Sequence, residues 1–158
     1  IVLDTNNFTL KTTAETYYAA YYLSSLGASA KKVQYLLKQD ILEYTERQKL
    51  LTRLEVIDDK IAFTKATSST IYRREDLAKI ADTLLFFNNI ESSFVIGKLD
   101  QDTVGVSARS LGNYNISKIL EKLGGGGDEY NGACVFKKKS ISQVEKLIKE
   151  QIKKQEGE

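Results

Sequence analysis

The stretch "TVGVSARSLGNYNISKILEKLGGGGDEYNGACVF" runs from Thr103 to Phe136 and decides the fold of the second half of the chain. At its start, apolar residues alternate with small or polar ones, which predicts a β-strand. Asn115 is a suitable N-cap for an amphipathic helix over 116–123, because its side chain can accept hydrogen bonds from the first turn. Four consecutive glycines follow, and residues 133–139 predict a short strand. This order indicates a sheet with a helix packed on it.

The segments on either side of this stretch extend the pattern. Residues 56–67 predict a hairpin, and apolar residues at helical spacing predict an amphipathic helix over 74–87. Residues 92–99 predict a strand antiparallel to the one over 103–110, and a final helix is expected to begin near Ser140. From residue 56 onward the expected order is therefore β-β-α-β-β-α-β-α. This order predicts an α/β or α+β domain with a mixed sheet flanked by helices.

The first part of the chain has a different pattern, in which a short apolar run is followed by helical segments. "IVLD" is a short apolar run that predicts the end of a buried strand at Asp4. Thr12 and Glu15 predict a capping box at the start of a helix that ends near Gly27. The tyrosines of this helix cover one broad face, which indicates packing against a neighbouring domain or, as the less favoured interpretation, stacking on bases. Residues 29–55 predict one or two further helices, the later part acting as a connector.

Composition limits the kinds of chemistry that the chain can perform. Its 158 residues carry a formal net charge of +2, so no strong basic field favours nucleic acid or membrane binding. No apolar run is long enough to predict a spanning helix. The chain has no histidine and one cysteine, Cys134, so a metal site here would depend on carboxylates or on groups outside the chain. Because methionine is also absent, we expect a piece of a longer protein.

The four glycines allow several interpretations. A helix stop explains one glycine but not the other three. A linker would leave too few residues after it for a domain. The letters "GGDEY" resemble part of a nucleotide-cyclase signature, which requires a hairpin turn with strands on both sides, whereas here a helix precedes them. A phosphate-binding loop is the fourth interpretation, since glycine lets backbone N–H groups approach an anion. Strand alternation places Gly105, Ser107 and Arg109 on one face nearby, and arginine binds phosphate well.

Several of these motifs together resemble a known family. "VSARS", "NISKILEKL", "GGGG" and "NGA" are similar to the DHHA1 domain of DHH-type phosphoesterases. "VLDTNNFTLKT", "ADTLLFFNNIESSFVIGK" and "DTVGVSARSLGNYNISKILEKLGGGG" resemble the C-terminal part of the GdpP-type cyclic di-AMP phosphodiesterases of Gram-positive bacteria. The likeness runs through nearly the whole chain. It implies that residues 1–38 are a remnant of a catalytic α/β DHH domain, residues 39–55 a helical linker, and residues 56–158 a DHHA1 domain that binds substrate.

The resemblance also implies roles for particular residues. Asp4 would be a ligand in a two-manganese (Mn²⁺) centre whose other ligands lie upstream, although the residues alone favour an aspartate that caps a turn. The wall facing the substrate would consist of Ser107, Arg109, Gly124, Gly125, Gly126, Gly127, Asp128 and Asn131. Metal-assisted hydrolysis would convert cyclic di-AMP to a linear dinucleotide, with the upstream DHH domain as the essential partner. This part alone would be inactive.

Two departures from the family pattern affect this expectation. Asp128 stands where the family usually has histidine after the glycines, and Lys11 stands where arginine is common. A carboxylate at position 128 would repel phosphate but could accept from a purine amino group. One alternative is an enzyme of the same superfamily, a nanoRNase that hydrolyses short RNA or a 3′-phosphoadenosine 5′-phosphate phosphatase. The other is a nucleotide- or RNA-binding module without catalysis, which the aspartate at position 128 favours. The resemblance further implies a cytoplasmic part of a protein that upstream helices could anchor in a membrane, and exposed sheet edges would allow a homodimer.

Overall fold

The computed structural model describes residues 1–67, 69–112 and 114–156. They fall into two compact units, Ile1–Asp40 and Ile41–Glu158, and each unit is described by itself. Within the described residues, every helix is too short or too polar to cross a bilayer.

The first unit consists of turns followed by two helices, α1 (Ala14–Ser25) and α2 (Ala30–Leu36). The predicted strand end at Asp4 is wrong, because residues 2–9 form successive turns. The three apolar residues before Asp4 have no strand to pair with among the described residues of this unit, so their backbone groups bond locally, as the Ile1 carbonyl does in accepting from Thr5 N–H at 3.0 Å.

The start of α1 also differs from the expectation by one residue. Thr13, not Thr12, is the N-cap, and it shares a capping box with Thr16 rather than with Glu15. The Thr13 hydroxyl donates to the Glu15 carboxylate at 2.6 Å, and this bond lowers the pKa of Glu15. The helix ends before Gly27, as predicted. Its tyrosines are exposed in this unit, and no residue of α1 is buried.

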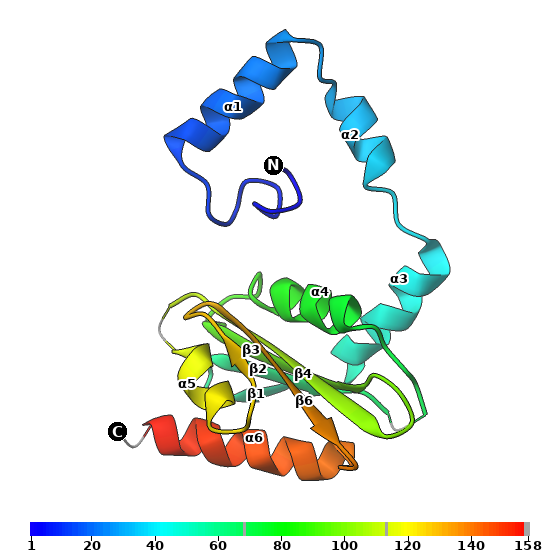
Figure 1. Cartoon of the computed structure of the whole chain (residues 1–158), viewed down its shortest axis with the longest axis vertical. Helices are drawn as coiled ribbons and strands as arrows, with labels where there is room; N and C mark the ends of the chain where they lie inside the picture. Colours follow the sequence, from blue (N-terminus) through cyan, green and yellow to red (C-terminus); the bar gives the residue numbers. More distant parts are fainter. Residues whose placement is uncertain (68, 113, 157–158) are drawn as a thin grey trace. The chain divides into compact units, whose positions relative to one another are not determined.

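The second unit contains a six-stranded mixed sheet with helices on both faces (Figure 1). It begins with α3 (Ile41–Gln48) and a 3-10 helix (Lys49–Arg53), which occupy the region that the sequence predicted as a helical linker. The remaining elements, in chain order, are β1 (Glu55–Ile57), β2 (Ile61–Lys65), α4 (Arg74–Leu84), β3 (Ser92–Lys98), β4 (Thr103–Ser110), α5 (Ile116–Glu121), β5 (Gly126–Gly127), β6 (Asn131–Lys137) and α6 (Ile141–Glu156).

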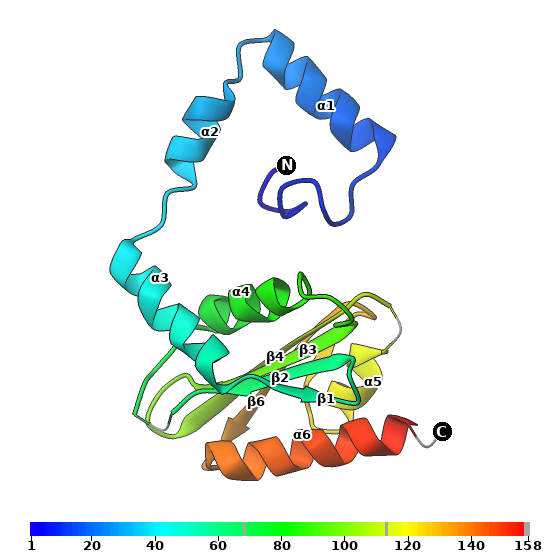
Figure 2. The same ribbon diagram turned by 180° about the vertical axis from the view of Figure 1, so that it is seen from behind.

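The strand order in the sheet is β1-β2-β3-β4-β6-β5. The β2–β3 pair is parallel and the other pairs are antiparallel. Helix α4 follows β2 and makes the crossover that a parallel pair requires. Figure 2 shows β2 and β1 together at one edge of the sheet. The predicted mixed sheet flanked by helices is therefore confirmed. Only the two-residue strand β5 is additional to the predicted order.

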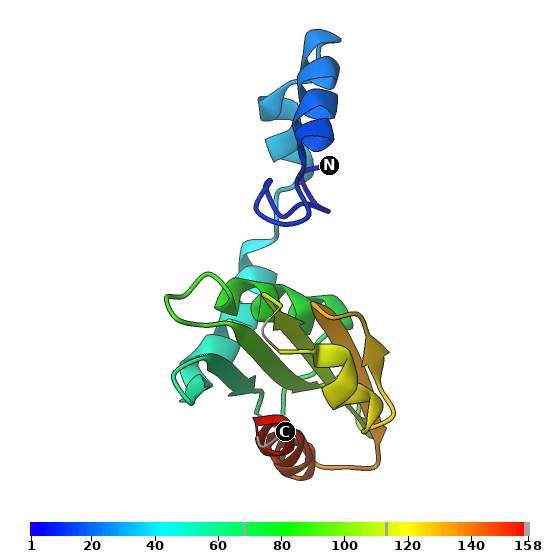
Figure 3. The same cartoon turned by 90° about the vertical axis from the view of Figure 1, so that its left-hand side faces the viewer.

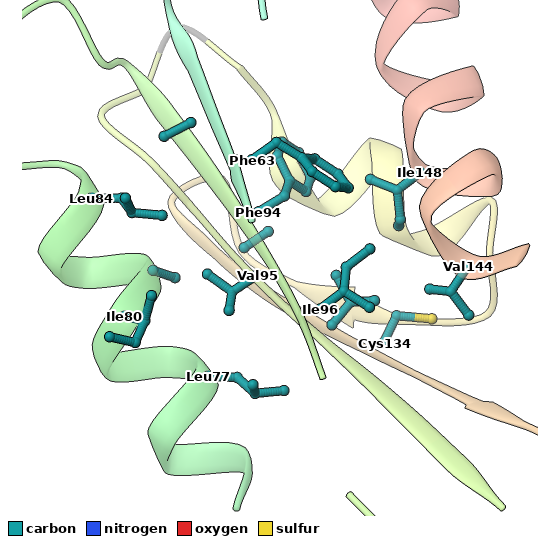
Figure 4. Close-up of a cluster of buried hydrophobic side chains, with 14 of the residues drawn as sticks. Phe63, Leu77, Ile80, Leu84, Phe94, Val95, Ile96, Cys134, Val144 and Ile148 are labelled. Atoms are coloured by element: carbon teal, nitrogen blue, oxygen red, sulfur yellow. The ribbon is translucent and has the colours of Figure 1, made fainter. Parts of the chain in front are cut away.

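The helices form one layer on each side of the sheet. Figure 3 shows the sheet edge-on, with α4 above it and α6 below it. In Figure 4, Leu77, Ile80 and Leu84 of α4 approach the sheet from the side of Val95, whereas Val144 and Ile148 of α6 approach Ile96 and Cys134 on the opposite side. Most of these side chains are fully buried. The helical spacing read from the sequence is confirmed in α4, α5 and α6, where the periodic apolar residues form the core.

Candidate functional site

A pocket of about 680 Å³ lies over strands β4 and β6, on the face of the sheet that α4 covers only in part. Its floor is made of small side chains because the register pairs Gly105 with Val135 and Ser107 with Ala133. The next pair, Arg109 and Asn131, closes the floor with polar groups. Strand alternation thus brings Gly105, Ser107 and Arg109 to one pocket, as the sequence predicted.

The guanidinium of Arg109 is held in place by neighbouring groups. Its Nε donates to Oδ1 of Asp82 on α4, and its Nη1 donates to the Ala108 carbonyl at 2.9 Å and the Ser107 hydroxyl at 3.3 Å. The side chain is 16% exposed. No hydrogen bond to Nη2 occurs within the described part of the chain, so this nitrogen retains donors for an anion. Nothing in the sequence indicated the ion pair with Asp82, which already occupies the Nε donor of this arginine.

The glycine run has several separate uses. Gly124 has a φ of +78° and ends α5, and the N–H of the following Gly125 donates to the Leu120 carbonyl at 2.9 Å. At Gly127 a Cβ atom would lie 2.1 Å from the Asn131 carbonyl oxygen, so a side chain would break the β5–β6 pairing. Gly126 and Gly127 line the pocket, but Gly124 and Gly125 do not. The run is therefore a helix stop joined to a tight strand, and only its second half borders the pocket.

Asp128 organises the turn between β5 and β6. Its Oδ1 accepts from the backbone N–H groups of Tyr130 at 2.8 Å and Asn131 at 2.7 Å, and from the Asn131 side chain at 3.2 Å. The letters "GGDEY" therefore do lie in a hairpin turn, contrary to the expectation that a helix leads directly into them. Aspartate is well suited to such turns because its carboxylate can cap nearby backbone donors. Asp128 and Asn131 both border the pocket, with the carboxylate engaged in the turn.

Helix α4 supplies a wall that the sequence analysis did not identify. Arg74, Glu75 and Ala78 line the pocket. Their helical spacing, with Asp82 one turn beyond Ala78, is the signal that could have revealed this wall. Cys134 also borders the pocket, but its thiol is buried and donates to the Leu123 carbonyl at 3.3 Å. Burial raises the pKa of this thiol, so Cys134 is a small core residue, as the sequence suggested, and not an activated nucleophile.

A second pocket, of about 700 Å³, lies between α3 and the start of α4. Arg47 and Asp76 form an ion pair there at 3.3 Å, and both are buried. Arg73 bonds to Asp76 at 3.0 Å and to Glu43 at 2.8 Å. Although burial opposes the charged form, the hydrogen bonds from Arg73 and Arg47 keep the pKa of Asp76 below its usual value. These charges satisfy one another, so they are best explained as a network that attaches α3 to α4.

The described residues do not form a metal centre. No cluster of three or more His, Cys, Asp or Glu side chains that could hold a metal occurs among them. The side chain of Asp4 is 93% exposed. The residues in hand therefore do not fit a two-manganese site, and Asp4 could supply at most one ligand to it.

The comparisons with known proteins agree with the fold. The DHHA1 domain model matches residues 58–154, all in the second unit. Cyclic-di-AMP phosphodiesterase GdpP of Geobacillus thermodenitrificans is 40% identical over 152 residues, which are 96% of this chain and 23% of that protein. Cyclic-di-AMP phosphodiesterase PdeA of Listeria monocytogenes is 42% identical over 148 residues, 94% of this chain and 22% of that protein. The chain thus spans less than a quarter of the length of these two relatives.

A solved structure shows the same fold. The crystal structure of an exopolyphosphatase-related protein from Bacteroides fragilis has a TM-score of 0.85 to this chain at 18% identity, covering 97% of this chain and 47% of that one. At this low identity the likeness concerns the fold alone. The DHHA1 model, in contrast, matches the sequence over more than half of the chain. The chain therefore belongs to the DHHA1 domain family.

Proposed function

We propose that this chain is the substrate-binding part of a phosphodiesterase that hydrolyses cyclic di-AMP to a linear dinucleotide. The observation that supports this proposal is the Arg109 pocket, which lies in a region about 40% identical to a protein named as a cyclic-di-AMP phosphodiesterase. Arginine is the side chain best suited to phosphate oxygens, because it keeps its charge and offers several donors.

Different pocket residues bind different parts of a nucleotide. The Nη2 of Arg109 donates to a phosphate oxygen, while Asp82 holds the guanidinium in place through Nε. Gly126 has open space above its backbone and Ala133 has a small side chain, so the sugar and base can lie close to the backbone there, whereas the Leu99 side chain covers Gly105. The role of this chain is to bind and orient the substrate, and the hydrolytic groups lie elsewhere in the protein.

The metal expected from the resemblance stays a prediction. We expect Asp4 to be one ligand of a manganese centre that the upstream DHH domain completes. In the natural-length protein, Asp4→Asn should lower the manganese content measured by elemental analysis, while Asp40→Asn serves as the matched control. Unchanged manganese content in the Asp4 variant would remove Asp4 from the ligand set.

The central experiment tests Arg109. In the natural-length protein, Arg109→Ala should lower kcat/KM for cyclic di-AMP by roughly tenfold or more, because a hydrogen bond to a charged group contributes about 1.5–3 kcal/mol. Arg53→Ala removes an exposed arginine outside the pocket and should leave kcat/KM unchanged. Unchanged kinetics in the Arg109 variant would contradict the assignment of the pocket.

A short RNA is the alternative substrate, since its phosphates would meet the same groups. The same assay should therefore include a linear di-adenylate ribonucleotide. Faster hydrolysis of the linear compound than of the cyclic one would favour the nanoRNase interpretation. Binding of both without hydrolysis, in protein shown to contain its metals, would favour the non-catalytic module.

A further inference from the structure

One face of helix α4 borders the pocket and carries a charged residue at each end. Arg74, Ala78 and Asp82 are spaced four residues apart and therefore lie on one face of the helix. The rotation of α4 is fixed by its buried residues Leu77, Ile80 and Leu84, which pack on the sheet. Arg74 and Ala78 consequently border the pocket, and Asp82 reaches Arg109.

An arginine lies at each end of this face, and the two differ in whether other residues of the fold bind them. At the Asp82 end, Arg109 is held by an ion pair and is only 16% exposed. At the other end, Arg74 is exposed and has no hydrogen bond or ion pair among the described residues. Its neighbour Arg73, by contrast, is bound to both Glu43 and Asp76. Of these three arginines, Arg74 is thus the one that the fold itself does not use.

Arg74 and Arg109 lie at opposite ends of the pocket. Ser93 of β3 donates to the Ala81 carbonyl near the end of α4, whereas a Cβ on Gly97 would meet Leu77 near its start. Because β3 pairs antiparallel with β4, α4 runs in the same direction as β4, and Arg109 lies near the end of the helix. Arg74 and Asp82 are eight positions apart in the helix, which corresponds to about 12 Å along the axis. The floor of small residues lies between the two ends.

We propose that Arg74 binds a second phosphate and makes this pocket selective for ligands with two phosphates over ligands with one. Arg109 would hold one phosphate and Arg74 the other, with the uncharged part of the ligand over the small-residue floor. The acidic Glu75 and Asp128, which also line the pocket, disfavour anions placed elsewhere along it. The proposal deepens the proposed function, because it rests on the same pocket and names dinucleotides with two phosphates as its ligand class.

Binding, rather than hydrolysis, provides the test. The natural-length protein is titrated by calorimetry with 5′-phosphorylated linear di-adenylate, which has two phosphates, and with adenosine 5′-monophosphate, which has one. We expect Arg74→Gln to weaken binding of the di-adenylate about tenfold and to leave the monophosphate within about twofold. Arg109→Gln should weaken both, and Arg53→Gln, the control on an exposed arginine outside the pocket, should weaken neither.

The outcomes separate this inference from the proposed function. Equal effects of Arg74→Gln on the two ligands, or no effect on either, would overturn the role of Arg74 even if the protein hydrolyses cyclic di-AMP. Selective loss of di-adenylate binding in a protein that hydrolyses nothing would support Arg74 while contradicting the phosphodiesterase proposal. If the wild-type protein binds neither ligand, the selectivity inference is wrong.

Discussion

The two faces of the sheet are built from the same strands but carry different side chains. On the face of α5 and α6, the strands contribute large residues such as Phe94 and Ile96, and both are fully buried. On the other face, α4 covers β3 and part of β4, and beyond it the strands carry Gly105, Ser107 and Ala133. Under the proposed function, one face serves stability and the open half of the other serves binding, and mutations can test this division.

The largest effect is expected at the packed face. Phe94→Ala should lower the free energy of unfolding by about 3–5 kcal/mol, because the ring is 0% exposed and its removal leaves a cavity. Val135→Ala, on the open half of the other face and 37% exposed, should cost less than about 1 kcal/mol. Urea denaturation of both variants measures the contrast. Similar losses in the two variants would break the distinction between the faces.

Asp76 sharpens the comparison, because it lies in a pocket but serves stability. Asp76→Asn should lower the free energy of unfolding by about 3 kcal/mol, since it removes the carboxylate charge from the buried ion pair with Arg47. The folded-state pKa of Asp76 is lowered. Its contribution is therefore fully present above the unfolded pKa of about 3.9 and is lost as the pH falls through the lower folded value. Unfolding curves between neutral and acidic pH should show a flatter profile in the variant, and an equally steep profile would contradict this role.

Asp82 tests the binding side of the comparison. Asp82→Asn should weaken the hold on Arg109 and reduce ligand affinity roughly fivefold, corresponding to about 1 kcal/mol. Because Asp82 acts through Arg109, the effect should disappear when Arg109→Gln is already present. Asp82→Glu should restore part of the affinity. An undiminished effect in the double variant would show that Asp82 acts independently of Arg109.

The smallest effect is expected at Asp128. Its carboxylate caps the β5–β6 turn, so Asp128→Ala should lower the free energy of unfolding by about 1 kcal/mol. Asp128→Asn keeps one acceptor oxygen and should cost less. Thermal unfolding of the two variants compares them directly. If alanine is no worse than asparagine, the turn does not depend on this side chain.

Helices whose apolar residues recur at helical spacing could be predicted from the sequence. In α6, the spacing of Ile141, Val144, Ile148 and Ile152 indicated one apolar face, and all four are buried. The caps at Asn115 and Ser140 were also readable, because each pairs with a donor three residues on. Local spacing carries this information, so it needs no knowledge of the rest of the fold.

The features that were missed depend on contacts between distant or featureless segments. Strand β5 consists of two glycines, so no side-chain alternation could reveal it. The Arg109–Asp82 bond joins residues 27 positions apart, and neither residue type alone predicts the other. The run ending at Asp4 has strand-like residues, but strand formation also needs a neighbouring strand. The pocket floor was predicted from strand alternation, whereas the α4 wall was missed, because helical spacing groups its residues on one face without saying which strand that face meets.

The short outer strands of the sheet have a consequence for solubility. The sheet ends in β1, of three residues, and β5, of two. Only Gly132 and Ala133 of β6 pair with β5, so among the described strands Cys134–Lys137 has no neighbour on its outer side. This open stretch leads into the three lysines of positions 137–139. Lysine at a strand edge disfavours the addition of another chain, so the open part of the sheet is protected against edge-to-edge aggregation by charge.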